Sequence, residues 1–354
     1  MLGELLKEQR EKLGLKVKEL ASKTLIDQTL ISRFEKGNRL PTEVQLATLA
    51  EILSMDLSEL RVQWLADKIV KVVQYEPMAI EAMMVAEQRV EYLKSNAALD
   101  QPKISPELSE KLRIADELRE KWVSKHPLGP SHLKRLQEYF DIQYTYESNR
   151  IEGNTLSLRE TDLVVNKGLT IGGKSMQEHL EAINHAEAIS FVNGMVNGSE
   201  VLNKRNLLDI HRLVLKGIDN DNAGFYRKVP VRISGSDVTL PQPYQLDRMM
   251  EDYFSFYLYN HKKLHPIILA AEMHERLVSI HPFIDGNGRT ARLIMNFILI
   301  SHGYTRANIK GSSESRSKYY YALDAVQTDG NTAPFYALVV DECMNSLQEH
   351  LELT

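Results

Sequence analysis

The order of apolar and polar residues predicts a protein made almost entirely of helices. The first sixty residues read as a run of short helices separated by glycine, proline and polar turns. Leu2, Leu5 and Leu6 begin the first helix, and the next three are expected at residues 17–22, 29–36 and 43–53. Residues 61–95 also have a helical pattern, with charges of both signs. A small helical domain is therefore expected at residues 1–60.

The longer second part of the chain predicts a further set of helices. Residues 95–106 contain prolines and small polar residues, which favours a linker, and a helix is expected at 107–124. Residues 131–152 can form one amphipathic helix, for which Gly153 is a natural stop, and residues 157–160 form a capping box for the next helix. The apolar side of the amphipathic helix is expected to carry Leu133, Leu136, Tyr139, Phe140 and Ile142.

One segment has the pattern of strands. Residues 231–236 and 238–240 read as two short strands around a Ser-Gly-Ser-Asp turn. Further on, residues 270–280 and 290–300 predict two helices, the second of them very apolar. The expected fold class is therefore all-α, with one small β-hairpin.

Composition narrows the class of protein. A chain of 354 residues with 43% apolar residues is long enough for two or three domains with real cores. Cys343 is the sole cysteine, which excludes an internal disulfide. The first residues lack a signal-peptide pattern, and the longest apolar run, 293–300, is far shorter than the roughly 20 residues of a membrane span. We expect a cytoplasmic protein with no membrane partner, and the net charge of −5 favours solubility.

The candidate chemistry lies between the two helices at 270–280 and 290–300. A Gly-Asn-Gly run at residues 286–288 stands at the N-terminus of the second helix, where free backbone N–H groups and the helix dipole attract an anion. Glycines there allow positive φ and close backbone approach. Arg289 and Arg292 are three residues apart on the first turn, so both can reach one polyphosphate. The sequence predicts a phosphate-handling site.

Residues 281–292 resemble the Fic-family signature, His-Pro-Phe-x-Asp/Glu-Gly-Asn-Gly-Arg-x-x-Arg, at every fixed position. Fic proteins typically transfer AMP from ATP to a hydroxyl side chain of a target protein and release pyrophosphate. The resemblance implies that His281 is the general base, a role that suits an imidazole of ordinary pKa near 6.5. It also implies that Asp285 holds a magnesium ion bridging the α- and β-phosphates. The expected ATP-binding residues of this window are Gly286, Asn287, Gly288, Arg289 and Arg292.

Two other segments resemble parts of the same family. The predicted hairpin resembles the Fic flap, which would hold a target segment as an added strand; its docking residues would be Val231, Arg232, Ile233, Ser234 and Gly235. Tyr319 and Tyr320 resemble the region that packs against adenine, because aromatic faces stack on bases. Without the resemblance, an ordinary surface hairpin and a tyrosine-containing core remain the alternatives.

Ser148 and Glu152 resemble the inhibitory motif of the family, Ser/Thr-x-x-x-Glu-Gly/Asn. Their spacing puts both on one face at the last turn of the helix at 131–152. A carboxylate at that end is disfavoured by the helix dipole and gains from a cationic partner. The resemblance implies that Glu152 pairs with Arg292 and keeps it from the γ-phosphate of ATP. The chain is thus similar to the Fic class whose inhibitory helix precedes the catalytic core.

The first sixty residues resemble the repressor/Cro-type helix-turn-helix family, through residues 19–21, 31–37, Pro41 and 49–50. In that family the third helix enters the major groove, and the residues expected to reach bases or phosphates are Gln28, Thr29, Ser32 and Arg33. Residues 1–60 hold nine Lys/Arg against ten Asp/Glu, whereas affinity for DNA comes mostly from phosphate neutralisation. A dimerisation or protein-docking module is therefore the alternative to DNA binding.

These patterns together predict an autoinhibited protein adenylyltransferase with a DNA-binding N-terminal domain. The expected organisation is a helix-turn-helix domain at 1–60, a helical connector and linker at 61–106, a Fic domain at 107–343 with its inhibitory helix at 131–153, and a C-terminal tail at 344–354. ATP and magnesium are the expected substrate and metal. The expected partners are a target protein or the chain itself, DNA, and a second copy as a homodimer. The alternatives are a transcriptional regulator that uses the Fic domain as a nucleotide sensor, and an enzyme in which Glu152 orients a water that removes AMP from the target.

Overall fold

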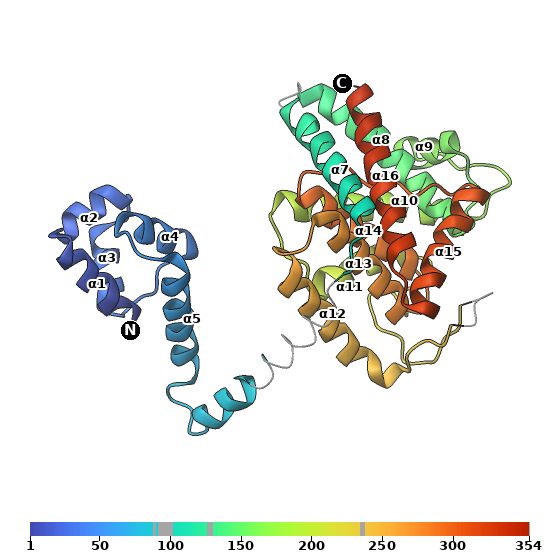
Figure 1. Cartoon of the computed structure of the whole chain (residues 1–354). Coiled ribbons are helices and arrows are strands. Elements are labelled where there is room, and N and C mark those ends of the chain that lie inside the picture. The colour runs from blue at the N-terminus through green and yellow to red at the C-terminus, as the bar shows by residue number, and fades with distance from the viewer. Residues whose placement is uncertain (88–89, 91–101, 126–129, 234–237, 354) are drawn as a thin grey trace. The chain divides into compact units, whose positions relative to one another are not determined.

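The structure, a computed structural model, describes residues 1–87, 90, 102–125, 130–233 and 238–353. Within these ranges the regular elements are helices and no strand is formed, which confirms the expected helical class. The chain divides into two compact units, residues 1–91 and 92–354, whose helices are labelled in Figure 1. None of the helices in the described ranges has both the length and the apolar character needed to cross a membrane.

The N-terminal unit is a bundle of short helices with an apolar interior. Its helices are α1 (Leu2–Lys12), α2 (Val17–Thr24), α3 (Gln28–Glu35), α4 (Glu43–Ile52) and α5 (Leu57–Val73). α1 crosses the end of α3 so closely that a Cβ atom on Gly3 would lie 2.4 Å from the Phe34 carbonyl oxygen. α5 belongs to the same unit, because Leu60 and Trp64 are in its core and the Trp64 indole N–H donates to the Pro41 carbonyl at 2.9 Å. The expected boundary at residue 60 is therefore wrong, since it falls inside α5.

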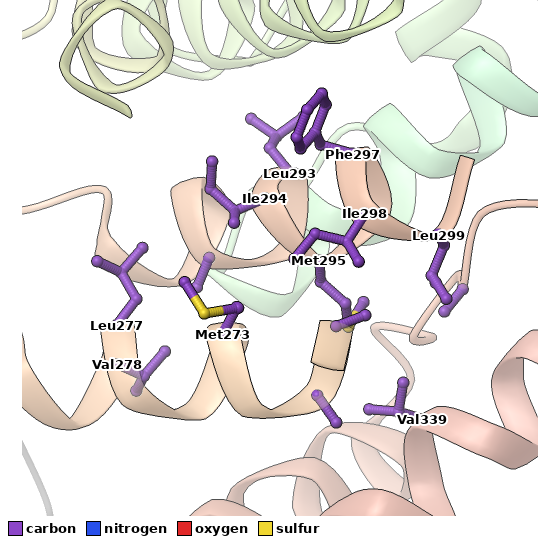
Figure 2. Close-up of a cluster of buried hydrophobic side chains, with 14 of the residues drawn as sticks. Met273, Leu277, Val278, Leu293, Ile294, Met295, Phe297, Ile298, Leu299 and Val339 are labelled. Carbon is purple, nitrogen blue, oxygen red and sulfur yellow. The ribbon is translucent and has the colours of Figure 1, made fainter. Parts of the chain in front are cut away.

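The second unit surrounds two central helices. Its elements are α7 (Pro106–Ser124), α8 (Pro130–Ile151), α9 (Leu158–Lys167), α10 (Met176–Asn197), α11 (Lys204–Leu215), the 3₁₀ turn η1 (Pro243–Gln245), α12 (Leu246–Asn260), α13 (Pro266–Ile280), α14 (Asn287–Ser301), α15 (Ser313–Asp329) and α16 (Ala333–Glu352). α13 and α14 pack along each other through fully buried side chains such as Met273, Leu277 and Ile294 (Figure 2). This apolar pair is the frame on which the connecting loop, 281–286, is held.

α8 and the turn after it follow the sequence prediction closely. Leu136, Phe140 and Ile142 are buried, whereas Tyr139 is 48% exposed and the side chain of Leu133 lies outside the described residues. The chain turns at Gly153, where φ is +100°. The next helix, α9, begins with the predicted capping box, in which Ser157 and Glu160 exchange side-chain and backbone hydrogen bonds.

Two expectations are corrected. Residues 228–233 and 238–240 are not in strand conformation, so the predicted hairpin is not formed in the described part of that segment; the intervening Ser234 and Gly235 lie outside the described residues. A two-stranded hairpin with no third strand is at best marginally stable in water. The expected tail at 344–354 is also wrong up to Glu352, because α16 continues to that residue and packs on α7 with Leu347 fully buried.

Candidate active site

The loop between α13 and α14 is closed by one side chain. The amide oxygen of Asn287 accepts from the Phe283 N–H at 3.0 Å, and its amide nitrogen donates to the Phe283 carbonyl at 2.9 Å. Asn287 is buried, and Phe283 beneath it is fully buried and stacked on the His211 ring at 3.6 Å. Both polar atoms of the amide therefore take part in closing the loop, and the second N–H of the amide has no part in these two bonds. The contact between this side chain and a phosphate stays a prediction. The backbone N–H groups at the start of α14 are further candidate anion-binding groups.

His281 ends α13 in the left-handed conformation, with φ 51°. Its Nδ1 lies 3.2 Å from the Val278 carbonyl oxygen, and because a carbonyl can only accept, Nδ1 carries the proton in this hydrogen bond. The Nε2 lone pair is then available to accept a proton. Burial lowers the pKa of His281, so the ring is neutral near pH 7. Both the tautomer and the charge state suit a general base.

Asp285 lies at the accessible edge of the loop, with its side chain 57% exposed. One carboxylate oxygen accepts from the Gly286 N–H at 2.6 Å, and the other lies 3.1 Å from Nη2 of Arg289. An exposed carboxylate next to a phosphate site fits magnesium, which is usually bound by one or two carboxylates together with substrate phosphates. Groups of three or more potential metal-ligating side chains are absent from the described ranges, so any ion held here would depend on the nucleotide for further ligands.

Arg289 is directed into the protein. Its side chain is 3% exposed, and it bridges Asp285 and, at 3.8 Å, Glu181 of α10. Its Nε and Nη1 atoms have no hydrogen-bond partner among the described residues. The guanidinium therefore has donors left for a phosphate oxygen or for water, although it is already fixed by two carboxylates.

Arg292 is almost completely enclosed, at 1% exposure. Nε donates to the Ser148 hydroxyl at 3.0 Å, and Nη2 donates both to the Ser148 carbonyl at 2.9 Å and to Oε1 of Glu152 at 2.7 Å. Nη1 lies 3.4 Å from the Tyr319 hydroxyl. Burial alone would lower the pKa of Arg292. The negative charge of Glu152, together with smaller contributions from other groups, outweighs this effect and raises the pKa above its ordinary value, so the arginine stays charged. The predicted ion pair between Glu152 and Arg292 is thus confirmed.

Glu152 also touches the glycine-rich turn. A Cβ atom on Gly288 would lie 2.6 Å from Oε1 of Glu152 and 3.1 Å from Nη1 of Arg292. The carboxylate therefore rests on the first turn of α14, at the end of the helix that attracts anions. This close approach is possible only because residue 288 has no side chain.

The two predicted adenine-binding tyrosines differ in position. Tyr319 is 1% exposed, and its hydroxyl lies between Arg292 and Nε2 of His274, at 3.0 Å from the latter. Tyr320 is 42% exposed, and its hydroxyl donates to the carbonyl of Ile151, the last residue of α8. Of the two rings, only that of Tyr320 offers a surface for stacking. Tyr319 instead supports the arginine that Glu152 holds.

The described residues of the predicted flap, 231–233, are not in strand conformation. Val231 and Ile233 are half-buried, and Arg232 is exposed. Just before them, the Arg227 N–H donates to the Pro282 carbonyl at 2.8 Å, which joins this segment to the catalytic loop. Sequence reasoning did not find His211 or Glu181, because a single polar residue outside a motif gives no signal of its own. Arg227 ends the run 224–227 that, with the predicted hairpin, resembles the Fic flap, but the sequence assigned it no role of its own.

In the N-terminal unit, the predicted DNA-contacting residues lie along one exposed part of α3. Gln28, Thr29 and Arg33 are exposed and Ser32 is partly exposed, while Ile31 and Phe34 of the same helix are in the core. Asp27 caps the helix, accepting from the N–H groups of residues 29 and 30 and from the Thr29 hydroxyl. The accessible cations of this surface are Arg33, Lys36 and Arg39.

Each of the two units contains a segment that matches the model of a known protein family. Residues 201–299 match the model of the Fic/DOC family, and residues 3–63 match that of a helix-turn-helix domain. The matched segments contain the loop at 281–286 and the exposed face of α3. The chain carries a Fic domain preceded by a helix-turn-helix domain.

Individual relatives agree with this assignment. A protein named protein adenylyltransferase Fic from Nematostella vectensis is 36% identical over 255 residues, which is 72% of this chain and 58% of the relative. One of the same name from Culex quinquefasciatus is 35% identical over 241 residues, 68% of this chain and 47% of the relative. The chain thus spans about half the length of these curated relatives.

Two solved structures share the fold. A Fic domain-containing signaling protein from Bacteroides thetaiotaomicron aligns with a TM-score of 0.62 at 28% identity, over 68% of this chain and 96% of that one. A Fic-1 fragment from C. elegans aligns with a TM-score of 0.63 at 26% identity, over 95% of this chain and 96% of that one.

Proposed function

We propose that this protein is an adenylyltransferase that transfers AMP from ATP to a hydroxyl side chain of a target protein, and that its own Glu152 inhibits the transfer. The names of the relatives support the reaction, and the loop at 281–292 supplies a neutral base beside an anion-binding helix start. The observation that carries the inhibition is the position of the Glu152 carboxylate, on Gly288 and against the buried Arg292.

The proposed reaction uses the residues of the loop in fixed roles. The target hydroxyl oxygen attacks the α-phosphorus of ATP, the bond from that phosphorus to the bridging oxygen of the β-phosphate breaks, and pyrophosphate leaves. Nε2 of His281 accepts the hydroxyl proton. N–H groups of the first turn of α14 hold phosphate oxygens, and Arg289 and Arg292 neutralise negative charge. Magnesium bound at Asp285 would supply further charge neutralisation on the phosphates.

Glu152 would oppose this reaction in two ways. First, it occupies Nη2 of Arg292, which Ser148 also contacts, so the arginine has few donors left for the γ-phosphate. Second, its negative charge rests on the helix start that should receive a phosphate, and like charges at such a distance repel. ATP would then bind weakly or with its α-phosphate away from His281.

Three variants test the proposal in the full-length chain with magnesium and ATP labelled at the α- or γ-position. Replacing Glu152 by Gly should raise protein labelling from α-labelled ATP by roughly 10- to 100-fold, the range of a coupling of a few kcal/mol. Adding His281→Ala should abolish that labelling, because the base is lost. Glu138→Gln is the matched control, since Glu138 is an exposed carboxylate on the same helix.

Other outcomes of this experiment have distinct meanings. Equal α-labelling of wild type and Glu152→Gly would contradict the inhibition. Label from the γ-position would indicate phosphate transfer instead of AMP transfer. Nucleotide binding without any labelling, in wild type and Glu152→Gly alike, would favour a nucleotide sensor.

We also propose that the N-terminal unit binds DNA through α3. The support is the match to a helix-turn-helix domain and the exposure of Gln28, Thr29 and Arg33 on one helix. Gel retardation of DNA from the protein's own operon at low salt tests it, with Arg33→Ala expected to weaken binding by several-fold and to lower the salt dependence by about one phosphate contact. Absence of retardation for every fragment would favour a protein-docking role for this unit.

A further inference from the structure

We propose that Arg227 is a positioning residue for AMP transfer, which holds the backbone of His281 and both ends of the 228–242 segment in one arrangement. The inference rests on the function proposed above, in which His281 is the base, and on the expectation from the sequence that residues 231–235 dock the target.

Arg227 reaches three separate stretches of backbone from one buried position. Its side chain is 3% exposed, and Nε donates to the His281 carbonyl at 2.8 Å. Nη1 donates to the Val229 carbonyl at 3.1 Å, and Nη2 donates to the Pro241 carbonyl at 2.6 Å. Its own backbone N–H donates to the Pro282 carbonyl at 2.8 Å. One guanidinium thus fixes the distances between the catalytic loop and both ends of the docking segment.

The chemistry of these contacts is specific to arginine. Among the described residues, Arg227 forms no ion pair with a carboxylate, and burial lowers its pKa. The partners of this buried charge are therefore backbone carbonyl groups. Burying a charge is costly unless its hydrogen-bond partners are well placed, so the positions of the three carbonyl groups matter. The guanidinium presents its donors in a rigid planar fork, whereas a lysine has a single ammonium at the end of a flexible chain. A lysine could keep the charge but could not keep three carbonyls in register.

The geometry of His281 explains why this matters for the reaction. His281 has φ 51°, a conformation that costs energy for a residue other than glycine and persists only where its surroundings enforce it. The Arg227 contact fixes the direction of the His281 carbonyl, and the Pro282 carbonyl next to it is fixed as well. Two hydrogen bonds from residue 227 thus hold the backbone of residues 281 and 282, and this backbone sets the direction of the imidazole.

The same contacts determine where a target segment could lie. Val229 and Pro241 stand on either side of the expected docking residues, and no strand pairing occurs in the described parts between them. The hydrogen bonds from Arg227 then set the spacing of the two ends of this segment. A target hydroxyl held next to residues 231–233 would therefore meet His281 at a distance that Arg227 controls.

His211 provides a second connection between the same two pieces of chain. Its Nδ1 accepts from the Gly224 N–H at 2.9 Å, so Nε2 carries the proton and donates to the Asp285 carbonyl at 2.9 Å. His211 holds the far side of the loop, but it does not reach Val229 or Pro241. Within the described ranges, Arg227 is the residue whose side-chain hydrogen bonds connect the loop to both ends of the docking segment, and for this reason we assign the positioning role to it.

The test compares Arg227→Met, Arg227→Lys and the control Lys262→Met in the Glu152→Gly protein. Lys262 is an exposed cation outside the loop and the docking segment. ATP affinity should stay within about threefold for all variants, because the start of α14 is intact. The rate of AMP transfer to protein should fall about 100-fold in both Arg227 variants, as expected for a misplacement of about 1 Å, and should be unchanged in Lys262→Met.

A second measurement does not depend on activity. Backbone hydrogen exchange of residues 228–233, 238–242 and 281–286 should be faster in Arg227→Met than in its parent, with exchange in α13 and α14 unchanged. If Glu152→Gly transfers no AMP, the proposed function fails while this exchange still tests the positioning role. Full activity in Arg227→Lys, unchanged exchange, or a parallel loss of ATP binding and thermal stability would each overturn the positioning role.

Discussion

α14 and α3 both carry arginines suited to phosphate-bearing partners, but they hold them differently. On α14, Arg289 and Arg292 are buried, and their partners come from α8, α10 and α15 as well as from the loop. On α3, Arg33 is exposed, and the buried residues of that helix are apolar. The α14 arginines therefore have positions set by the interior of the protein, whereas the position of Arg33 is left to be set by a partner.

This difference has an energetic meaning. Removing one partner of a buried, hydrogen-bonded charge leaves the other unpaired, which typically costs 3–5 kcal/mol, whereas an exposed charge pair contributes about 0–1 kcal/mol. A single carboxylate such as Glu152 can consequently control the α14 site. No single contact could control the α3 surface in the same way.

The largest effect should follow from removing Arg292. In the Glu152→Gly protein, Arg292→Ala should lower AMP transfer by roughly 100- to 1,000-fold, because a preorganised charge aimed at the phosphates is lost. Arg33→Ala in the same background should leave transfer unchanged, since α3 lies in the other unit. Rates measured with α-labelled ATP check both, and an effect of Arg33→Ala on transfer would show that the two arginine sites are not independent.

The next effect concerns pH. All histidines lie outside residues 1–91, and in the Fic unit burial lowers the pKa of His211 and of His350 to about 4. Between the folded-state pKa of about 4 and the ordinary pKa of about 6.5, the unfolded chain binds more protons than the folded one. The free energy of unfolding therefore falls as pH decreases through that range. Each of these two histidines should lower the free energy of unfolding by about 2 kcal/mol when the pH is changed from 7 to 5.

The two tryptophans allow each unit to be followed separately in the full chain. Trp64 is in the N-terminal unit and Trp122 in the Fic unit, so Trp64→Phe and Trp122→Phe each leave one reporter of denaturant unfolding. The Fic unit should lose stability on moving from pH 7 to pH 5, and His211→Gln should reduce the loss. An equal loss in the N-terminal unit would mean that histidine burial is not its cause.

The smallest effect concerns glycine-to-alanine substitutions, whose influence on stability should have opposite signs in the two units. Gly3→Ala would place a methyl group against backbone atoms of Phe34 and Glu35, which cannot rotate away, and should destabilise the N-terminal unit by about 1–3 kcal/mol. Gly194→Ala is the counterpart in α10, where a Cβ would meet no atom within 4 Å, and should stabilise the Fic unit by about 0.5–1 kcal/mol. Melting temperatures of the two variants check the opposite signs.

The sequence was most informative where chemistry depends on a local run of residues. The pairing of Glu152 with Arg292 could be predicted because both lie in recognisable motifs, and α8, α13 and α14 follow from apolar spacing. The closing of the loop by Asn287 was not predicted, because an amide at a helix start can bond to a ligand or to its own backbone, and only the positions of the Phe283 backbone atoms reveal the second of these.

Tertiary contacts account for the remaining differences. Tyr319 and Tyr320 are adjacent in sequence, yet one supports Arg292 and the other touches the end of α8, because neighbouring helical residues point about 100° apart. Arg227 belongs to a run that resembles the Fic flap, but its role could not be predicted, since its partners are carbonyl groups, which every residue has. The strands at 231–236 and 238–240 were predicted from local sequence around a turn and from the resemblance to the Fic flap, and neither supplies the further pairing that a hairpin needs.

Gly288 places a constraint on how this protein can change over evolutionary time. The position that must stay free of a side chain for the Glu152 carboxylate is also the one where the start of α14 would receive a phosphate. Under the proposed function, a substitution at Gly288 that expelled Glu152 would damage the nucleotide site as well. Descendants of this protein that lose inhibition and keep activity should therefore carry their changes at Ser148 or Glu152. Gly288 should persist in descendants with the inhibition and in those without it.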